Sequence, residues 1–180
     1  TMTRVSVIGT GRWGTAFSIV LAAAGCEVRM WGRRAEVVDQ VNSSHTNGDY
    51  LPDLLLPETV SATSDPAEAV EGVDIVVLAV PSQTLRTNLA QWADFLPRKA
   101  AVVSLMKGVE LGTTKRMSEV IAEVGHVAAQ RIVVVSGPNL AREIAVNQPA
   151  ASVVASIAAS TPEQVAKAWS APHLDRETTL

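Results

Sequence analysis

Hydrophobic residues in this chain form short continuous runs, separated by stretches whose apolar positions recur every three or four residues. Continuous Val and Ile runs are typical of strands buried on both faces, and the longer period indicates helices. The runs predict strands at residues 4–8, 27–31, 60–63, 74–80, 101–105, 132–136 and 151–155. The intervening pattern predicts helices at 13–24, 35–42, 66–70, 84–95, 113–124, 141–146 and 162–170. This alternation predicts an α/β fold with a mainly parallel, doubly wound sheet.

Composition narrows the class of protein. With 180 residues, 47% of them hydrophobic and 18% charged, the chain is expected to fold as one domain with a substantial core. The net charge of −3 argues against a nucleic-acid or anionic-membrane binder, and no apolar run approaches the roughly 18 residues that span a bilayer. The single cysteine, Cys26, is expected to be a small buried residue in a reducing environment. We therefore expect a cytoplasmic chain without signal peptide or membrane segment, and no metal site.

One glycine-rich turn joins the first predicted strand to the first predicted helix. Gly9, Gly11 and Gly14 have the spacing of a dinucleotide-binding turn, in which the first permits a tight turn and the second leaves room for a pyrophosphate. Gly14 would allow the helix to pack closely on the strand, and the helix N-terminus would face the phosphates. The position between a strand and a helix supports this Rossmann-like interpretation over a plain structural turn.

The end of the second predicted strand bears on which dinucleotide binds. NAD-binding domains usually place an acidic residue there, whereas this chain has Arg33 and Arg34. Two guanidinium groups suit a 2′-phosphate, so we expect NADP(H) to be preferred over NAD(H). The alternative is that both arginines are solvated charges at a helix start.

Other strand ends supply further candidate residues, because ligands of open α/β sheets bind beside the carboxyl ends of the strands. Pro81 follows the fourth strand on the expected nicotinamide side, and Lys107 follows the fifth, where it could hold a phosphate or carboxylate. The segment 43–58 is long for a connection and rich in Leu, which favours an ordered loop packed on the domain.

Five segments stand in order along the chain: Gly9–Ala16 at the first turn, Asn42 to Pro52 in the long connection, and 79–82, 106–110 and 136–143 further on. Taken together, they resemble five motifs of the bacterial NAD(P)-dependent glycerol-3-phosphate dehydrogenases, and the likeness extends from residue 4 to about 173. The resemblance implies a dinucleotide-binding domain at 1–173, followed by a tail, 174–180, that departs from the family pattern.

The resemblance also assigns roles to residues. It implies dinucleotide contacts from Arg12, Trp13, Arg33, Arg34, Tyr50, Lys107 and Ala141. Lys107, Gly137 and Asn139 would bind dihydroxyacetone phosphate or sn-glycerol 3-phosphate. Trp13 could instead be a core aromatic residue and Asn139 a helix cap. His45 is expected to hydrogen-bond within the loop rather than act as a base.

The resemblance implies a second, helical domain that carries the catalytic lysine and that we do not expect within these 180 residues. We therefore expect the cofactor half of an enzyme that reduces dihydroxyacetone phosphate with NAD(P)H for glycerophospholipid synthesis, with little turnover alone and self-association through uncovered apolar surface. The alternatives are a non-catalytic NAD(P)-binding module and a two-domain dehydrogenase of the 6-phosphogluconate or ketopantoate type. The segments 136–138 and 50–52 argue against the second alternative.

Overall fold

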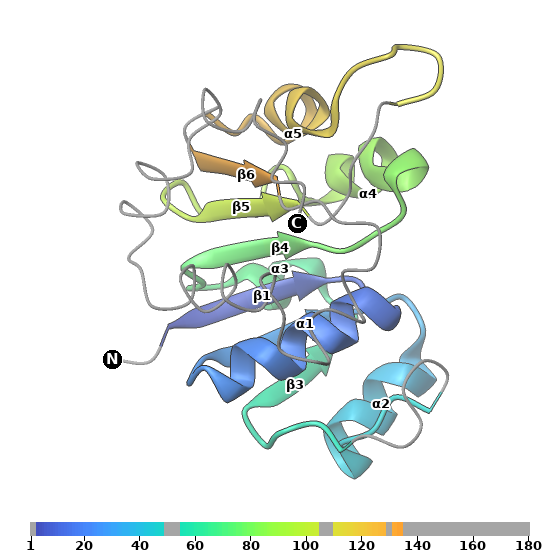
Figure 1. Ribbon diagram of the computed structural model, residues 1–180, viewed down its shortest axis with the longest axis vertical. Helices are drawn as coiled ribbons and strands as arrows, with labels where there is room; N and C mark the ends of the chain where they lie inside the picture. Colours follow the sequence, from blue (N-terminus) through green and yellow to red (C-terminus); the bar gives the residue numbers. More distant parts are fainter. Residues whose placement is uncertain (1–2, 49–54, 105–109, 129–130, 135–180) are drawn as a thin grey trace.

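Six parallel strands form one sheet in the order β3-β2-β1-β4-β5-β6 (Figure 1). This computed structural model describes residues 3–48, 55–104, 110–128 and 131–134. The chain runs outward from β1 in one direction and, after a crossover, outward from β4 in the other. The β1–β4 boundary is therefore the topological switch point, where open α/β sheets bind their ligands. The predicted doubly wound, Rossmann-like fold is confirmed.

The strands are short and their ends are level. They span Arg4–Ile8 (β1), Glu27–Trp31 (β2), Val60–Thr63 (β3), Ile75–Leu78 (β4), Ala101–Ser104 (β5) and Ile132–Val134 (β6). Ile8 pairs in register with both Trp31 and Leu78, so the last residues of β1, β2 and β4 lie side by side. The segments that follow these three strands therefore leave the sheet at one edge.

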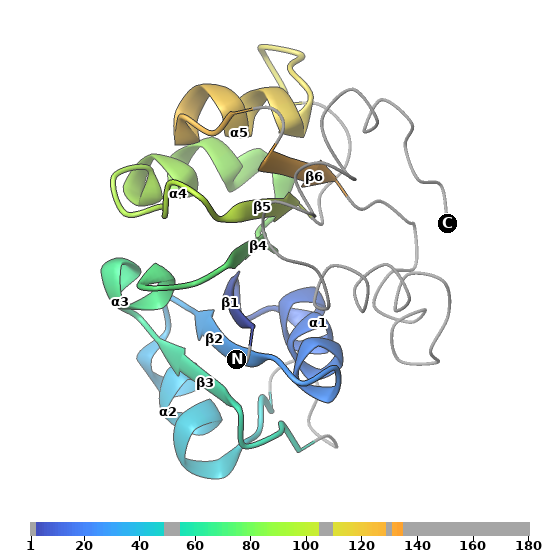
Figure 2. The same ribbon diagram turned by 90° about the vertical axis from the view of Figure 1, so that its left-hand side faces the viewer.

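Helices cover both faces of the sheet (Figure 2). They span Arg12–Ala23 (α1), Ala35–Ser44 (α2), Pro66–Val70 (α3), Leu85–Trp92 (α4) and Met117–Gly125 (α5), with a short 3-10 helix, η1, at Ser82–Thr84. Strand residues alternate between two cores: Val5 and Val7 pack with α1 and α2, whereas Ile8 packs with α3, α4 and α5. This period of two, buried on both sides, explains why the strands are continuous apolar runs.

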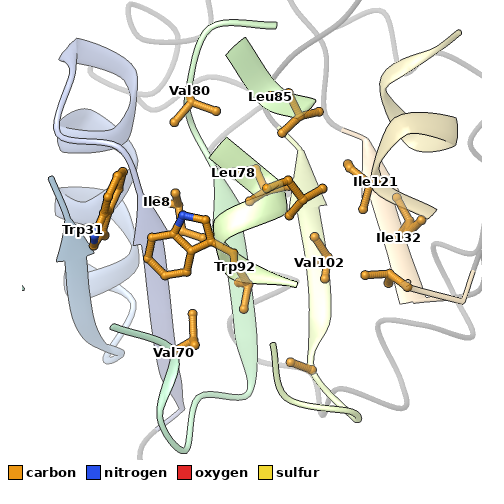
Figure 3. Close-up of a cluster of buried hydrophobic side chains, with 14 of the residues drawn as sticks. Ile8, Trp31, Val70, Leu78, Val80, Leu85, Trp92, Val102, Ile121 and Ile132 are labelled. Atoms are coloured by element: carbon orange, nitrogen blue, oxygen red, sulfur yellow. The ribbon is translucent and has the colours of Figure 1, made fainter. Parts of the chain in front are cut away.

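Two tryptophans anchor the core beneath α3, α4 and α5 (Figure 3). The rings of Trp31, the last residue of β2, and Trp92, the last of α4, meet edge to face with centroids 4.9 Å apart. The Nε1 of Trp31 donates to the Ser64 carbonyl oxygen at 3.0 Å. An edge-to-face pair adds to the burial of two large rings, so the β2 end is firmly held.

Local signals explain the helix boundaries. Gly25, with φ of +93°, follows α1 as expected, and Asp65 caps α3 by accepting from the Ala67 N–H at 3.0 Å. The helix expected at 113–124 starts later, at Met117, because Gly112 and Thr114 have positive φ and form a turn. The expectation of a helix from Thr84 to Phe95 is likewise too long, since η1 occupies Thr84 and α4 ends at Trp92.

The long connection after α2 is only partly as expected. Leu56 is buried in the core, but Leu55 is 76% exposed.

Cys26 is buried and free, as predicted, and burial raises the pKa of its thiol. The elements expected at 141–146, 151–155 and 162–170 lie outside the described residues. Among the described residues no helix is long and apolar enough to cross a membrane.

Candidate dinucleotide site

The turn between β1 and α1 lies at the switch point of the sheet. Gly9 has φ of +127°, and its N–H donates to the carbonyl oxygen of Trp31 at 2.9 Å. A Cβ at Gly9 would stand 2.5 Å from the carbonyl oxygen of Ala79, the residue that follows β4. Only glycine combines this conformation with this approach. The turn is thus fixed between the ends of β2 and β4.

Gly14 brings α1 against the turn itself. A Cβ at Gly14 would lie 2.4 Å from the carbonyl oxygen of Gly9 and 3.3 Å from the Cβ of Ala79. The Ser18 hydroxyl donates to the Gly14 carbonyl oxygen at 2.7 Å within the helix. The close packing expected of Gly14 from the sequence is therefore present.

Gly11 differs from the other two glycines of the motif. A Cβ at Gly11 would meet no atom of the described residues within 4 Å, and the φ of −73° is open to any residue. Neither packing nor backbone strain among these residues therefore requires glycine there, although the N-cap position favours glycine over alanine by about 1 kcal/mol. A phosphate approaching the backbone would require it.

Helix α1 begins at Arg12, its N-cap residue Gly11 provides no side-chain cap, and no acidic residue occupies its first turn. The first N–H groups of a helix lack intrahelical acceptors, and they carry the positive end of the helix dipole. Arg12 and Trp13 belong to this first turn by their backbone. An uncapped N-terminus of this kind suits an anion with several acceptor oxygens, such as a pyrophosphate.

Two residues that the sequence interpretation did not single out complete the turn. Gly32, directly after β2, leaves room for the Thr10 side chain, whose Cγ2 would stand 2.6 Å from a Cβ there. Asn47 is fully buried and donates to the Thr10 carbonyl oxygen at 2.8 Å. The position of Gly32 directly after the second strand was a signal in the sequence. Asn47 lies 37 residues from Thr10 in the sequence, and only the fold brings it to the turn.

Arg33 and Arg34 follow Gly32 at the end of β2, and both are exposed. An Nη2 of Arg33 donates to the Oδ1 of Asn88, a buried residue of α4. Asn88 in turn donates to the Thr84 hydroxyl at 3.1 Å. The Arg33 guanidinium is thus directed across the edge of the sheet toward the start of α4, where the sequence pattern offered no sign of a partner.

Arg34 lies at the N-cap of α2 and forms an ion pair with Glu36 at 3.0 Å. Backbone hydrogen bonding and then Arg34 lower the pKa of the Glu36 carboxyl. Glu36 stands in the first turn of α2 rather than at the strand end, as the sequence suggested. An exposed ion pair holds its partners weakly, so Arg34 can exchange Glu36 for another anion.

Pro81 lies on the segment after β4, at the same edge as the glycine turn. It is exposed, and its carbonyl oxygen accepts from the N–H and hydroxyl of Thr84 at 3.0 and 2.9 Å.

The other predicted site residues lie outside the described residues: Tyr50, Lys107, Gly137, Asn139 and Ala141. The Nδ1 of His45 has no hydrogen-bond partner among the described residues, so the expected loop hydrogen bond through it is not found there. Within the same residues no group of three or more His, Cys, Asp or Glu could hold a metal ion.

Comparison with known proteins agrees with this architecture. The family described as NAD-dependent glycerol-3-phosphate dehydrogenase N-terminus matches residues 4–162. A protein of Streptomyces griseus named glycerol-3-phosphate dehydrogenase NAD(P)+ is 62% identical over 152 residues, which cover 84% of this chain and 45% of that protein. A protein of the same name from Corynebacterium aurimucosum is 51% identical over 172 residues, or 96% of this chain and 52% of that protein.

A solved structure shows the same fold. The crystal structure of glycerol-3-phosphate dehydrogenase from Coxiella burnetii superposes with a TM-score of 0.72 at 33% identity, over 82% of this chain and 45% of that chain. The present chain thus spans about half the length of the relatives that it matches. This chain belongs to the NAD-dependent glycerol-3-phosphate dehydrogenase family, and it matches the part of the family described as the N-terminus.

Proposed function

We propose that this chain binds NAD(P)(H) with the pyrophosphate in the turn from Gly9 to Gly14. The proposal rests above all on Gly11, where nothing in the described protein fills the space that a side chain would take. The uncapped N–H groups of α1 supply donors for the phosphate oxygens, and the first turn of α1 has no carboxylate to repel them. The residues present therefore fit a dinucleotide.

The two arginines after β2 support a preference for NADP(H) over NAD(H). In this fold the second strand ends near the adenosine ribose, where a guanidinium can hold a 2′-phosphate through paired hydrogen bonds. Arg33 is already oriented by Asn88, and Arg34 exchanges a weak ion pair for the phosphate. The carboxylate that would accept from a free 2′-hydroxyl is missing from the segment 32–34.

The complete enzyme, in this proposal, is a cytoplasmic oxidoreductase that reduces dihydroxyacetone phosphate to sn-glycerol 3-phosphate for glycerophospholipid synthesis. A reduced nicotinamide, when bound, supplies the hydride. Lys107, Gly137 and Asn139 would hold the substrate, with the lysine opposing its phosphate charge, and Arg12, Trp13, Tyr50, Pro81 and Ala141 would line the dinucleotide. The relatives are about twice as long as this chain, and a lysine in the part of them that it does not match would donate the proton to the ketone oxygen.

The test is a calorimetric titration of the chain with NADPH and with NADH, alongside the variants Gly11→Ala and Ser61→Ala. Gly11→Ala adds a methyl where the described residues leave room, so it should lower the free energy of unfolding only by about 1 kcal/mol, through the N-cap preference for glycine over alanine. Its affinity for both dinucleotides should fall by about tenfold or more, because the methyl separates phosphate from backbone. Ser61→Ala, at an exposed position of β3, is the control and should bind normally. Equal affinity in Gly11→Ala, or no binding by the parent chain, would refute the proposal.

A further inference from the structure

The side chain of Asn47 is inserted beneath the glycine turn. It is 0% exposed, and its Nδ2 lies 2.8 Å from the carbonyl oxygen of Thr10 and 2.9 Å from the hydroxyl of Thr15. Because a carbonyl oxygen can only accept, the atom facing Thr10 must be the amide nitrogen. The amide of Asn47 therefore hydrogen-bonds the peptide group between Thr10 and Gly11 from within the protein.

Thr15 extends this contact to the next peptide. Its hydroxyl lies 2.7 Å from the carbonyl oxygen of Gly11, to which it must donate, and it therefore accepts from Asn47. The two side chains, with the Thr15 N–H that also donates to the Gly11 carbonyl oxygen at 3.0 Å, fix the carbonyl oxygens of Thr10 and Gly11. Since each peptide is planar, fixing those oxygens also fixes the N–H groups of Gly11 and Arg12, which point the opposite way.

The backbone around Asn47 is itself held. His45, the C-cap of α2, has φ of 53°, and its carbonyl oxygen accepts from the Leu56 N–H at 2.6 Å. The Gly48 N–H donates to the Oε1 of Gln40, in α2, at 2.7 Å. These contacts, all made by described residues, attach the segment that carries Asn47 to α2 and to the residues before β3.

The stability of the fold does not account well for this arrangement. The Oδ1 of Asn47 is buried and has no hydrogen-bond partner in the part of the chain that the structure describes. A buried acceptor without a partner is destabilising, and such local costs concentrate at functional sites. An apolar side chain of similar size would avoid that cost but would take the donor from the Thr10 carbonyl oxygen, so what the amide provides is a contact with the turn.

We propose that Asn47 is a positioning residue, which with Thr15 sets the N–H groups of the glycine turn in the orientation that a dinucleotide pyrophosphate requires. The inference rests on the proposed dinucleotide site and adds to it a residue outside the glycine motif. Asn47 does not touch the phosphates in this account. Asn47 restrains the turn before the dinucleotide binds, so the turn has less conformational freedom to lose on binding. This is the general advantage of a preorganised site.

The experiment compares neutral variants, so that charge repulsion of the phosphates plays no part. Asn47→Leu keeps the approximate volume and removes the donors, and Thr15→Val removes the hydroxyl while Thr15→Ser retains it. The matched control is Asn42→Leu: Asn42 also bonds backbone groups, donating to the Ala62 carbonyl oxygen at 2.9 Å and accepting from the Ala62 N–H at 2.8 Å, but at β3. NADPH affinity is measured by calorimetry and Tm by thermal unfolding for each chain.

Asn47→Leu and Thr15→Val should each weaken NADPH binding by about tenfold, the effect of one net hydrogen bond. Thr15→Ser and Asn42→Leu should bind within about twofold of the parent chain, although Asn42→Leu should have a lower Tm. Normal binding by Asn47→Leu, or losses of affinity that simply follow the losses of Tm in all variants, would overturn the inference while leaving the dinucleotide site intact. If Asn47→Leu does not fold, the Thr15 pair decides. Failure of the parent chain to bind would instead refute the proposed function.

Discussion

Gly9, Gly11 and Gly14 share a motif but have three different physical reasons for being glycine. Gly9 needs its positive φ, Gly14 needs its close contact with Gly9, and Gly11 is the one of the three that the described residues leave in open space. A sequence motif cannot separate requirements of folding from requirements of binding. The distances to neighbouring atoms do separate them.

Gly14→Ala should therefore destabilise the protein. The added Cβ would lie 2.4 Å from the Gly9 carbonyl oxygen, which is backbone and cannot rotate away. Overpacking of this kind typically costs about 1–3 kcal/mol, measurable by urea unfolding. Gly11→Ala is the control for an added methyl and should lose no more than about 1 kcal/mol, through its N-cap position. A Gly14→Ala variant as stable as the control would contradict the packing described for α1.

Arg33→Ala should change the choice of cofactor. Loss of the guanidinium should weaken NADPH binding by about tenfold, because a charged hydrogen bond to the 2′-phosphate is removed, and should leave NADH binding nearly unchanged. Calorimetric titration with both dinucleotides measures this ratio. Arg98→Ala removes an equal charge from an exposed position before β5, at the opposite edge of the sheet, and should alter neither affinity. A parallel loss of both affinities in Arg33→Ala would contradict the assignment.

The turn at 110–116, before α5, is held by charged side chains from two helices. The Nε of Arg86, in α4, lies 2.9 and 3.2 Å from the two carboxylate oxygens of Glu110. Its Nη1 lies 3.1 Å from a carboxylate oxygen of Glu123, in α5. Thr113 donates to Glu110 at 2.6 Å. This network joins the turn at 110–116 to two helices, and it directly follows the segment in which Lys107 is expected.

Glu110→Gln should lower stability most at neutral pH. Hydrogen bonds from Arg86 and then Thr113 lower the pKa of the Glu110 carboxyl in the folded protein. The contribution of the Glu110 carboxylate to the free energy of unfolding is therefore complete above the pKa of an unfolded glutamate, about 4.3. It is lost as the pH falls through the lower pKa of the folded protein. Thermal unfolding between pH 7 and pH 3 should show the difference between the two proteins shrink toward the acid end. A difference that grew on acidification would contradict this account of the network.

Element types were predictable from the sequence because the strands are buried on both faces, as the continuous run in β4 shows. Element boundaries were less so: the start of α5 depends on Gly112 and Thr114 adopting positive φ, which no hydrophobic period records. Contacts between distant elements, such as those of Arg33 with Asn88 and Asn47 with Thr10, follow only from the strand order. The glycine turn was predictable because its function requires a short contiguous motif.

At the scale of the whole molecule, the chain spans about half the length of its relatives. We expect these 180 residues alone to bind a dinucleotide but to oxidise NADPH with dihydroxyacetone phosphate far more slowly than a complete enzyme. Loss of general acid catalysis alone typically costs about 10²–10⁴-fold in rate. Absorbance at the NADPH band, with a full-length relative as the positive control, measures the rate. Turnover comparable to that control would contradict the expected division of roles.

In the proposed complex, the turn from Gly9 to Gly14 cradles the pyrophosphate of a dinucleotide. The backbone amide NMR spectrum of the chain, titrated with NADPH, tests this contact residue by residue. The amides of residues 9–15 should shift most, joined by those of 32–34, and all should saturate with one dissociation constant. Unchanged amides in the turn at saturating NADPH, or shifts confined to other parts of the sheet, would contradict the account.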